Sequence, residues 1–363
     1  MLAFMLAAVL SIAYYDEAYE IIRRVISYNI PEVFFPDRNA ILKAMLAIDM
    51  AGIFTLIGVI TWRACSSIGP GDFNRKQIDR INAIPATDRF SFAVMGDSGH
   101  GYRVFKRILK KIDMDDYIFA LVNGDLVMHG RRDNYRAFFN LIRNRKTPYL
   151  AAMGNHDLRH RSPQNFVDVF GRPHYSFAFG DSLFIIMNVA FDDRITGEQK
   201  AWAEEQLRRQ FTHKFLFFHT PLFDPRPGKN HCIQDEANAR EFMALLEKYR
   251  PDIVFNSHVH GYFDRTRNGV NYVVTGGAGQ GLKMHGDSDE HHFHHYVKID
   301  IKGDQVYKKV VPISFSESRR TFSLWMDGVY NFWVRQRLSV ILYILCLIFL
   351  INAGMNLLMK FTS

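Results

Sequence analysis

The sequence predicts an α/β fold in which two β-layers are flanked by helices, with transmembrane helices near both ends of the chain. Three observations support this prediction. Strand-like and helix-like runs alternate in the middle of the chain, as they do where helices cover a sheet. Later strand-like runs, two of them joined by Gly180 and Asp181, supply a second β-layer. Long apolar runs lie at residues 41–62 and 338–359.

Composition fits a folded chain with membrane contact. The chain has 363 residues, is 48% hydrophobic and contains 31 Phe, which is enough for one or two domains with a proper core. The formal net charge is +8, but the basic residues are scattered and no stretch is typical of a nucleic-acid-binding module. We therefore expect membrane lipids, and no nucleic acid, as partners. The three Cys are widely spaced, which predicts no disulfide framework.

Membrane segments are expected on both sides of a middle domain. Residues 338–359 carry no charge and are long enough to cross a bilayer as a helix. Residues 319–337 precede them and contain several aromatic side chains, which predicts an amphipathic, interfacial linker. An N-terminal membrane region, residues 1–64, holds a second spanning run at 41–62 and a short apolar run at 1–14. Basic residues flank these segments on both sides, so the charge rule leaves the orientation of the multi-pass chain open.

The middle domain is expected to cover residues 85–315. Its first half reads β-α-β-α-β, with apolar strand-like runs at 90–95, 117–123 and 147–153. The runs 103–112 and 134–145 between them have apolar residues three and four positions apart, as helices do.

The second half begins with the hairpin and ends in β-structure. Thr196 is placed to cap a helix over 197–210. The remaining predicted elements are strands at 213–219 and 251–257, a helix at 235–249, and β-structure over 272–279 and 294–311.

Polar side chains follow five of the predicted strands. In open α/β sheets, ligands bind at the carboxyl ends of strands, so these side chains are candidates for one site. They occur in the stretches "MGDSGHG", "NGDLVMHG", "GNHDLRHR", "FFHTP" and "SHVHG". Each stretch alone is explained by a turn or a histidine at the rim of the core. Together they offer carboxylate, amide and imidazole donors without a thiolate, a set that suits hard-to-borderline divalent metals.

The order GD, GD, GNHD, H, HxH resembles the calcineurin-like metallophosphoesterase superfamily. The resemblance spans Asp97 to His260 and implies a metallophosphoesterase-like sandwich over the whole middle domain. The opening "GDSG" is most similar to the purple acid phosphatase-like branch. It implies a metal-dependent phosphoric ester hydrolase with two divalent transition-metal ions, Mn, Fe, Zn or Co.

The resemblance also assigns roles to individual residues. It implies that Asp125 bridges the two ions and that Asp97 and His260 bind the first. Asn155, His219 and His258 are implied as ligands of the second. His156 is expected to stabilise or protonate the leaving-group oxygen, and Asp157 to orient His156 by a hydrogen bond. Two cations about 3.5 to 4 Å apart can clamp a phosphoryl group and hold the hydroxide that attacks it.

Two departures from the family pattern each remove a ligand of the first ion. Gly99 stands where one branch has a histidine, and Met128 stands where the purple branch has a tyrosine. His100 and His129 each lie one residue past a vacant position. We prefer His100 as the replacement, because the glycines on either side of it let the loop bend.

Substrate class follows less directly from the sequence. Arg159 and Arg161 come directly after GNHD, and the guanidinium group suits phosphate recognition. Membrane segments on both sides would hold the site near the bilayer, which favours a lipid-linked phosphoester or diphosphate. Two alternatives stay open: a membrane-tethered phosphodiesterase for a soluble nucleotide or sugar phosphate, and a non-catalytic membrane adaptor.

Overall fold

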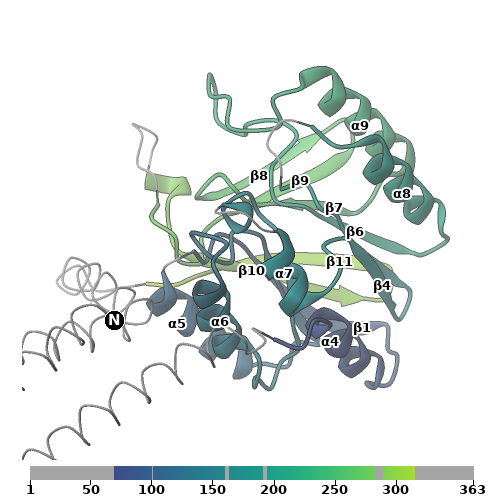
Figure 1. The fold of residues 1–363 in the computed structure, drawn as a ribbon. Coiled ribbons are helices and arrows are strands. Elements are labelled where there is room, and N and C mark those ends of the chain that lie inside the picture. Colours follow the sequence, from purple (N-terminus) through teal and green to yellow (C-terminus); the bar gives the residue numbers. More distant parts are fainter. Residues whose placement is uncertain (1–68, 100, 160–162, 191–193, 283–288, 315–363) are drawn as a thin grey trace, which may run out of the picture. The chain divides into compact units, whose positions relative to one another are not determined.

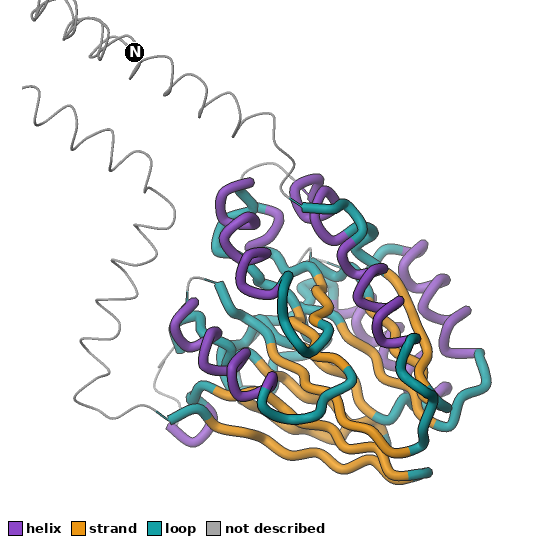
Figure 2. The backbone as a smooth tube through the Cα atoms, turned by 90° about the horizontal axis from the view of Figure 1, so that it is seen from below, coloured by secondary structure: helices purple, strands orange, loops and turns teal. Residues whose placement is uncertain are grey.

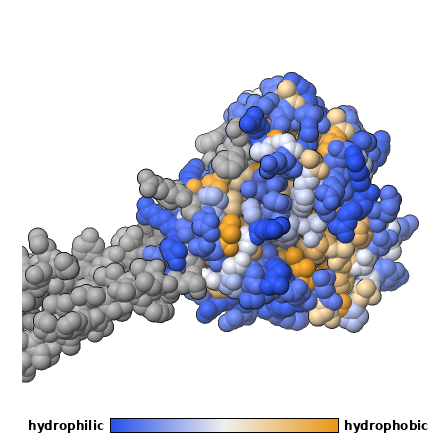
Figure 3. Space-filling model, turned by 45° about the vertical axis from the view of Figure 1, so that its right-hand side comes forward, coloured by the Kyte–Doolittle hydropathy of each residue, from blue (hydrophilic) through white to orange (hydrophobic). Residues whose placement is uncertain are grey.

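The computed structural model describes residues 69–99, 101–159, 163–190, 194–282 and 289–314. The predicted membrane segments, residues 1–14, 41–62 and 338–359, and the interfacial linker 319–337 lie outside these residues. No helix within the described ranges has the length and apolar character to cross a membrane. Hydrophilic side chains cover most of the face seen in Figure 3, and apolar ones form small patches between them.

Sheet A contains the predicted first three strands and the last two. Its strand order is β11-β10-β1-β2-β3, in which β1, β2 and β3 run parallel and β10 pairs with β1 antiparallel. The strands are β1 (Arg89–Met95), β2 (Phe119–Asn123), β3 (Tyr149–Ala152), β10 (His295–Lys302) and β11 (Gln305–Pro312). Helices α5 (Tyr102–Asp113) and α6 (Arg132–Ile142) make the two parallel crossovers, as the sequence predicted.

Sheet B has the order β4-β5-β6-β7-β9-β8. Strands β5, β6, β7 and β9 are parallel, and the antiparallel pairs β4·β5 and β8·β9 close the two edges. The strands are β4 (Tyr175–Phe179), β5 (Ser182–Ile186), β6 (His213–Phe217), β7 (Ile253–Asn256), β8 (Tyr262–Arg267) and β9 (Val270–Thr275). Helix α8 (Gly197–Arg208) starts at Thr196, whose hydroxyl accepts the Gln199 amide as predicted, and α9 (Glu236–Tyr249) follows β6.

Phenylalanines fill the space between the two sheets. Phe92 and Phe119 of sheet A stack with ring centroids 5.0 Å apart, and Phe184 and Phe215 of sheet B meet Phe92 edge-on. Two further apolar layers lie on the outer faces, where α5 and α6 cover sheet A and α8 and α9 cover sheet B (Figure 1). In the perpendicular view, helices lie along the sides of the strands, which reach the lower edge of the domain (Figure 2). The predicted α/β class with two sheets flanked by helices is confirmed.

Some elements of the structure were absent from the sequence-based prediction. Helices α4 (Phe73–Asn82) and α7 (Pro163–Phe170) cover sheet A, and β8 extends sheet B. Asn74 of α4 donates to the Ala151 carbonyl and accepts the Ala151 amide, which satisfies the exposed edge of β3. The predicted domain start at residue 85 therefore leaves out a helix that the sheet uses. A short 3₁₀ turn, Asp289–His291, precedes β10.

His295 gives the fold a pH-dependent stability. Its ring is buried between Thr275 Oγ1 at 3.1 Å and the Phe293 carbonyl at 2.8 Å, and burial together with His294 lowers its pKa to about 4. Below pH 6.5, the ordinary pKa of histidine, this residue therefore binds a proton in the unfolded chain. In the folded chain its ring stays neutral down to about pH 4. As pH falls from 6.5 to 4, this difference should cost about 3 kcal/mol.

The expected result is a steeper pH dependence for the wild type than for His295→Gln. Urea unfolding of the metal-free protein at pH 7 and pH 4.5 should show the wild type losing about 2–3 kcal/mol more than the variant. Equal losses in the two proteins would contradict a neutral, buried His295.

Candidate metal centre

The carboxyl ends of β1, β2, β3, β6 and β7 bring the predicted ligands to one edge of the sandwich. Asp97 and Asp125 lie two residues past β1 and β2, and Asn155 follows β3. His219 and His258 lie two residues past β6 and β7 of the other sheet. Asn123 joins the sheets at this edge, because its side-chain amide donates to the carbonyls of Phe218 and Phe255.

The predicted ligands of the second ion converge. Asn155 Oδ1 lies 3.2 Å from His219 Nε2 and 3.2 Å from His258 Nδ1. Asp125 Oδ1 lies 3.3 Å from His219 Nε2. Donors at the usual bond length of about 2.1 Å around a tetrahedral ion are about 3.4 Å apart. The spacing therefore fits a first-row divalent ion between these four side chains.

The predicted ligands of the first ion lie beside them. His260 Nε2 is 3.5 Å from Asp97 Oδ1, and ligand atoms of Asp97, Asp125 and His219 all fall within 4.8 Å of one another. In the described residues, Asp97 Oδ1 and His258 Nε2 are buried without a hydrogen-bond partner. Buried polar atoms of this kind are costly unless a cation or ligand satisfies them.

Backbone carbonyls fix the histidine tautomers. His219 Nδ1 lies 3.0 Å from the Asn123 carbonyl, and His260 Nδ1 lies 2.7 Å from the Gly281 carbonyl. Each Nδ1 therefore carries a proton, and each Nε2 is the ring atom that faces the carboxylates. This arrangement of carbonyl, imidazole and donor atom is typical of metal-binding histidines.

Three of the converging residues have strained backbones. Asp97, Asp125 and His258 have φ angles of 61°, 51° and 67°, a region that side-chain-bearing residues rarely adopt. Strain of this kind costs of the order of 1–3 kcal/mol per residue and clusters at functional sites. The folded chain tolerates it here because surrounding hydrogen bonds hold the turns, as from His258 N to Asp97 Oδ2 at 2.9 Å.

The buried carboxylates of the site favour positive charge on their neighbours. Burial alone would raise the pKa of Asp125 and lower that of His219, but their mutual attraction outweighs burial, lowering the first and raising the second. A protonated His219 thus acts as the counter-ion of Asp125. Burial and the neighbouring His219 and His231 hold the pKa of His258 well below its usual value, so its nitrogens stay available as ligands.

The structure corrects the predicted role of Asp157. Its carboxylate does not hydrogen-bond to His156 but accepts the backbone amides of Leu126, Val127 and Gly154, at 3.2, 3.1 and 2.8 Å. Burial and the charge of Asp125 raise its pKa to about 8 against these hydrogen bonds. The residue fastens the loop after β2 to the GNHD turn, so it positions Asp125 and Asn155.

His156 instead depends on the main chain for its orientation. It opens the 3₁₀ turn His156–Leu158, and its Nδ1 lies 3.1 Å from the Met128 carbonyl. Its Nε2 is left 3.9 Å from Asp125 Oδ2, and its amide donates to Asp125 Oδ1 at 2.8 Å. The predicted leaving-group residue therefore lies at the carboxylate expected to bridge the ions.

The remaining candidates fall into two groups. Arg159 is exposed and directly follows the 3₁₀ turn that His156 opens, and burial together with the charge of Arg159 lowers the pKa of His156. His129 is half-buried but is not among the clustered ligand atoms of the described residues. His100 and Arg161 lie outside the described residues.

Two residues near the site were missed by sequence reasoning. The ring of His231 lies 3.9 Å from that of His258, centroid to centroid, and Gln280 lies beside Gly99. Neither belongs to a motif, and both come from loops whose course depends on the folded chain. The one available clue was the run of glycines around Gln280, which allows a close backbone approach.

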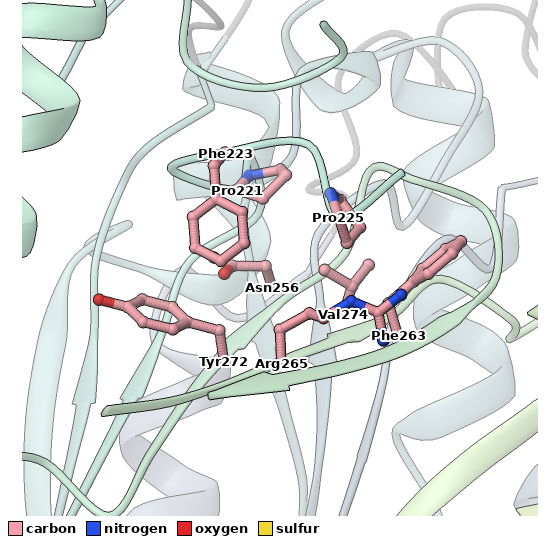
Figure 4. A pocket seen from close by; sticks show the side chains of 8 residues that line it. All are labelled: Pro221, Phe223, Pro225, Asn256, Phe263, Arg265, Tyr272 and Val274. Carbon is pink, nitrogen blue, oxygen red and sulfur yellow. The ribbon is translucent and has the colours of Figure 1, made fainter. Parts of the chain in front are cut away.

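The loop after β6 is built to present His231. Asp224 accepts two hydrogen bonds from the Arg226 guanidinium and one from the His231 amide. Figure 4 shows Pro221, Phe223 and Pro225 of this loop lying over strands of sheet B, around a small apolar pocket. The Phe223 and Tyr272 rings meet edge-on at 5.2 Å, which anchors the loop beside the site.

Known proteins share this domain. Residues 90–262 match the family model of calcineurin-like phosphoesterase. Purple acid phosphatase 23 of Arabidopsis thaliana is 28% identical over 147 residues, covering 36% of this chain and 31% of the relative. A probable cyclic nucleotide phosphodiesterase of Moraxella catarrhalis is 30% identical over 166 residues, covering 39% and 57%. Serine/threonine-protein phosphatase CPPED1 of Homo sapiens is 24% identical over 181 residues, covering 43% and 58%.

A solved structure shares the fold. Purple acid phosphatase PPD1 from yellow lupin seeds superposes with a TM-score of 0.50 at 18% identity, covering 61% of this chain and 51% of the other. The chain spans between 31% and 58% of the lengths of the three curated relatives described above. Residues 90–262 therefore form a domain of the calcineurin-like phosphoesterase type.

Proposed function

We propose that the protein is a membrane-anchored phosphoesterase that uses two divalent metal ions to hydrolyse a phosphomonoester, phosphodiester or diphosphate bond. The observation that carries this proposal is the convergence of Asn155, His219 and His258 with Asp125, at spacings that fit a coordinated ion. The family of the domain supports the same chemistry.

The donor set divides between two ions with Asp125 in common. Asp97, Asp125 and His260 would hold one ion, and Asp125, Asn155, His219 and His258 the other. The chemistry that such a pair supplies is activation of a water nucleophile and neutralisation of the phosphoryl oxygens. The oxygen and nitrogen donors present would suit Mn, Fe, Zn or Co.

His156 and Arg159 serve the substrate. With Nδ1 donating to the Met128 carbonyl, His156 presents Nε2 to the departing oxygen, and the imidazolium form of the ring can give up its Nε2 proton there. Arg159 is exposed at the same turn, where its guanidinium can pair with a phosphate oxygen. We propose that Arg161, two residues further along, adds to this contact.

We propose a lipid-linked phosphoester as the substrate. The support is the uncharged run at residues 338–359 and the apolar run at 41–62, which would hold the domain at a bilayer. A soluble nucleotide is the second candidate, favoured by the resemblance to a probable cyclic nucleotide phosphodiesterase. A non-catalytic adaptor is the third, favoured by the departures at Gly99 and Met128.

Metal removal and substrate choice test these functions together. The full chain in detergent, stripped with a chelator, should lose hydrolysis of an aryl phosphate and regain it with Mn, Zn, Fe or Co. Two metal equivalents per chain are expected. One equivalent or none, with no turnover of any phosphoester, would favour the adaptor.

The substrate class is tested by comparing efficiencies. A lipid phosphoester in mixed micelles should be hydrolysed with a kcat/KM at least tenfold above that of the aryl phosphate, as an order-of-magnitude expectation from remote binding energy. A cyclic nucleotide is the parallel arm. Equal efficiency for the lipid and the aryl phosphate would rule out lipid specificity, and preference for the nucleotide would establish the second candidate.

A further inference from the structure

The first ion lacks a ligand that other members of the superfamily supply. Asp97, Asp125 and His260 offer three side chains, whereas the positions that would complete the set hold Gly99 and Met128. The two vacancies come from loops after β1 and β2. A replacement has to reach the space between these loops.

Gln280 reaches this space from the loop after β9. A Cβ atom built on Gly99 would lie 2.9 Å from Gln280 Oε1 and 3.1 Å from its Cδ. The amide of Gln280 therefore occupies the space into which a side chain at position 99 would extend. Its Nε2 lies 3.5 Å from the Met128 sulfur, so the same amide also contacts the second vacant position.

The backbone fixes Gln280 between the other ligands. Its own amide donates to the Asp97 carbonyl at 2.7 Å, and the carbonyl of the next residue, Gly281, accepts from His260 Nδ1 at 2.7 Å. A shift of this loop would thus disturb both Asp97 and His260. The approach is close because Gly279 (φ 149°) and Gly101 pack backbone to backbone.

The side chain is buried with an unused acceptor. Gln280 is 6% exposed, and its Oε1 has no hydrogen-bond partner among the described residues. A buried, unpaired amide oxygen costs about 1–3 kcal/mol, which an apolar side chain filling the same gap would avoid. Side-chain amide oxygens are ordinary ligands of divalent cations, as with Asn155 of the same site.

We propose that Gln280 Oε1 is the missing ligand of the first metal ion, in place of a side chain at position 99 or 128. The assignment rests on the proposed two-ion function and deepens it. It also separates the roles of the two amides: Asn155 serves the second ion and Gln280 the first. The amide is neutral, so this ion keeps more positive charge than a tyrosinate ligand would leave on it.

The test measures metal binding rather than activity alone. Full-length protein, its Gln280→Ala, Gln280→Met and Gln280→Glu variants, and the surface control Gln305→Ala are stripped of metal and titrated with Co²⁺. The d–d absorption bands report each bound ion, and equilibrium dialysis gives the stoichiometry. Gln280→Met has a similar shape without the oxygen and serves if the alanine variant does not fold.

Gln280→Ala and Gln280→Met should weaken one of two Co²⁺ sites at least about tenfold and change its spectrum. Gln280→Glu should restore binding, and Gln305→Ala should match the wild type. Unchanged affinities and spectra in Gln280→Ala would overturn the assignment while leaving the two-ion proposal intact. Loss of one site in His100→Ala but not in Gln280→Ala would assign the position to His100. A wild-type chain that binds no Co²⁺ would instead overturn the proposed function itself.

Discussion

Replacement of Asp125 by alanine is expected to lower kcat/KM for any phosphoester by at least about a thousandfold. Asp125 is 1% exposed, lies 3.3 Å from His219 Nε2 and accepts the His156 amide. Its carboxylate lies among the donors proposed for both ions, so its loss should reduce bound metal to below one equivalent per chain.

Elemental analysis and steady-state kinetics of Asp125→Ala check this expectation side by side. Asp116→Ala is the matched control, because that aspartate is 98% exposed and pairs with Lys146 at the surface. The control should keep full activity and both ions. Wild-type turnover in Asp125→Ala would remove the proposed mechanism.

Replacement of Asp157 by alanine should destabilise the folded chain by about 3–5 kcal/mol. The substitution leaves the amides of Leu126, Val127 and Gly154 buried without an acceptor. These amides belong to the two turns that carry Asp125 and Asn155, so metal affinity should fall as well. Denaturant unfolding and Co²⁺ titration of the same sample measure both effects.

His156→Ala provides the contrast that separates a positioning residue from a catalytic one. It should unfold within about 1 kcal/mol of the wild type, because its ring is partly exposed, yet lower kcat by a factor of about 10²–10⁴. The reverse pattern, a stable Asp157→Ala and an unstable His156→Ala, would restore the role for Asp157 that the family resemblance implied.

The sequence predicted the layers and the converging ligands because both depend on local patterns. Apolar runs and helical spacing located β1, α5 and β2 to within about three residues. Asp97 and His258 could be placed together because the strands preceding them are parallel to their neighbours and end at one edge. The candidates for one site thus followed from which residues come directly after strands, while their division between two ions followed from the family resemblance.

What the sequence did not predict depends on contacts between distant segments. Asp157 was predicted to orient its neighbour His156 by a hydrogen bond. Its carboxylate oxygens instead accept backbone amides from a loop about thirty residues earlier. Asn74 pairs with an edge strand 77 residues away, which no local pattern encodes. Gln280 belongs to no sequence motif. Its proposed role as a ligand depends on the space that Gly99 and Met128 leave beside it.

The proposed metal ligands come from both sheets, so bound ions would hold the two sheets together. Asp97, Asp125 and Asn155 come from sheet A, while His219, His258 and His260 come from sheet B. Each proposed ion would therefore connect sheet A to sheet B, next to the hydrogen bonds by which the Asn123 side chain already connects them. Any sliding of the phenylalanine-packed layers would displace part of the donors of both ions at once. A higher metal concentration would consequently raise the melting temperature of the two-sheet domain as well as its activity.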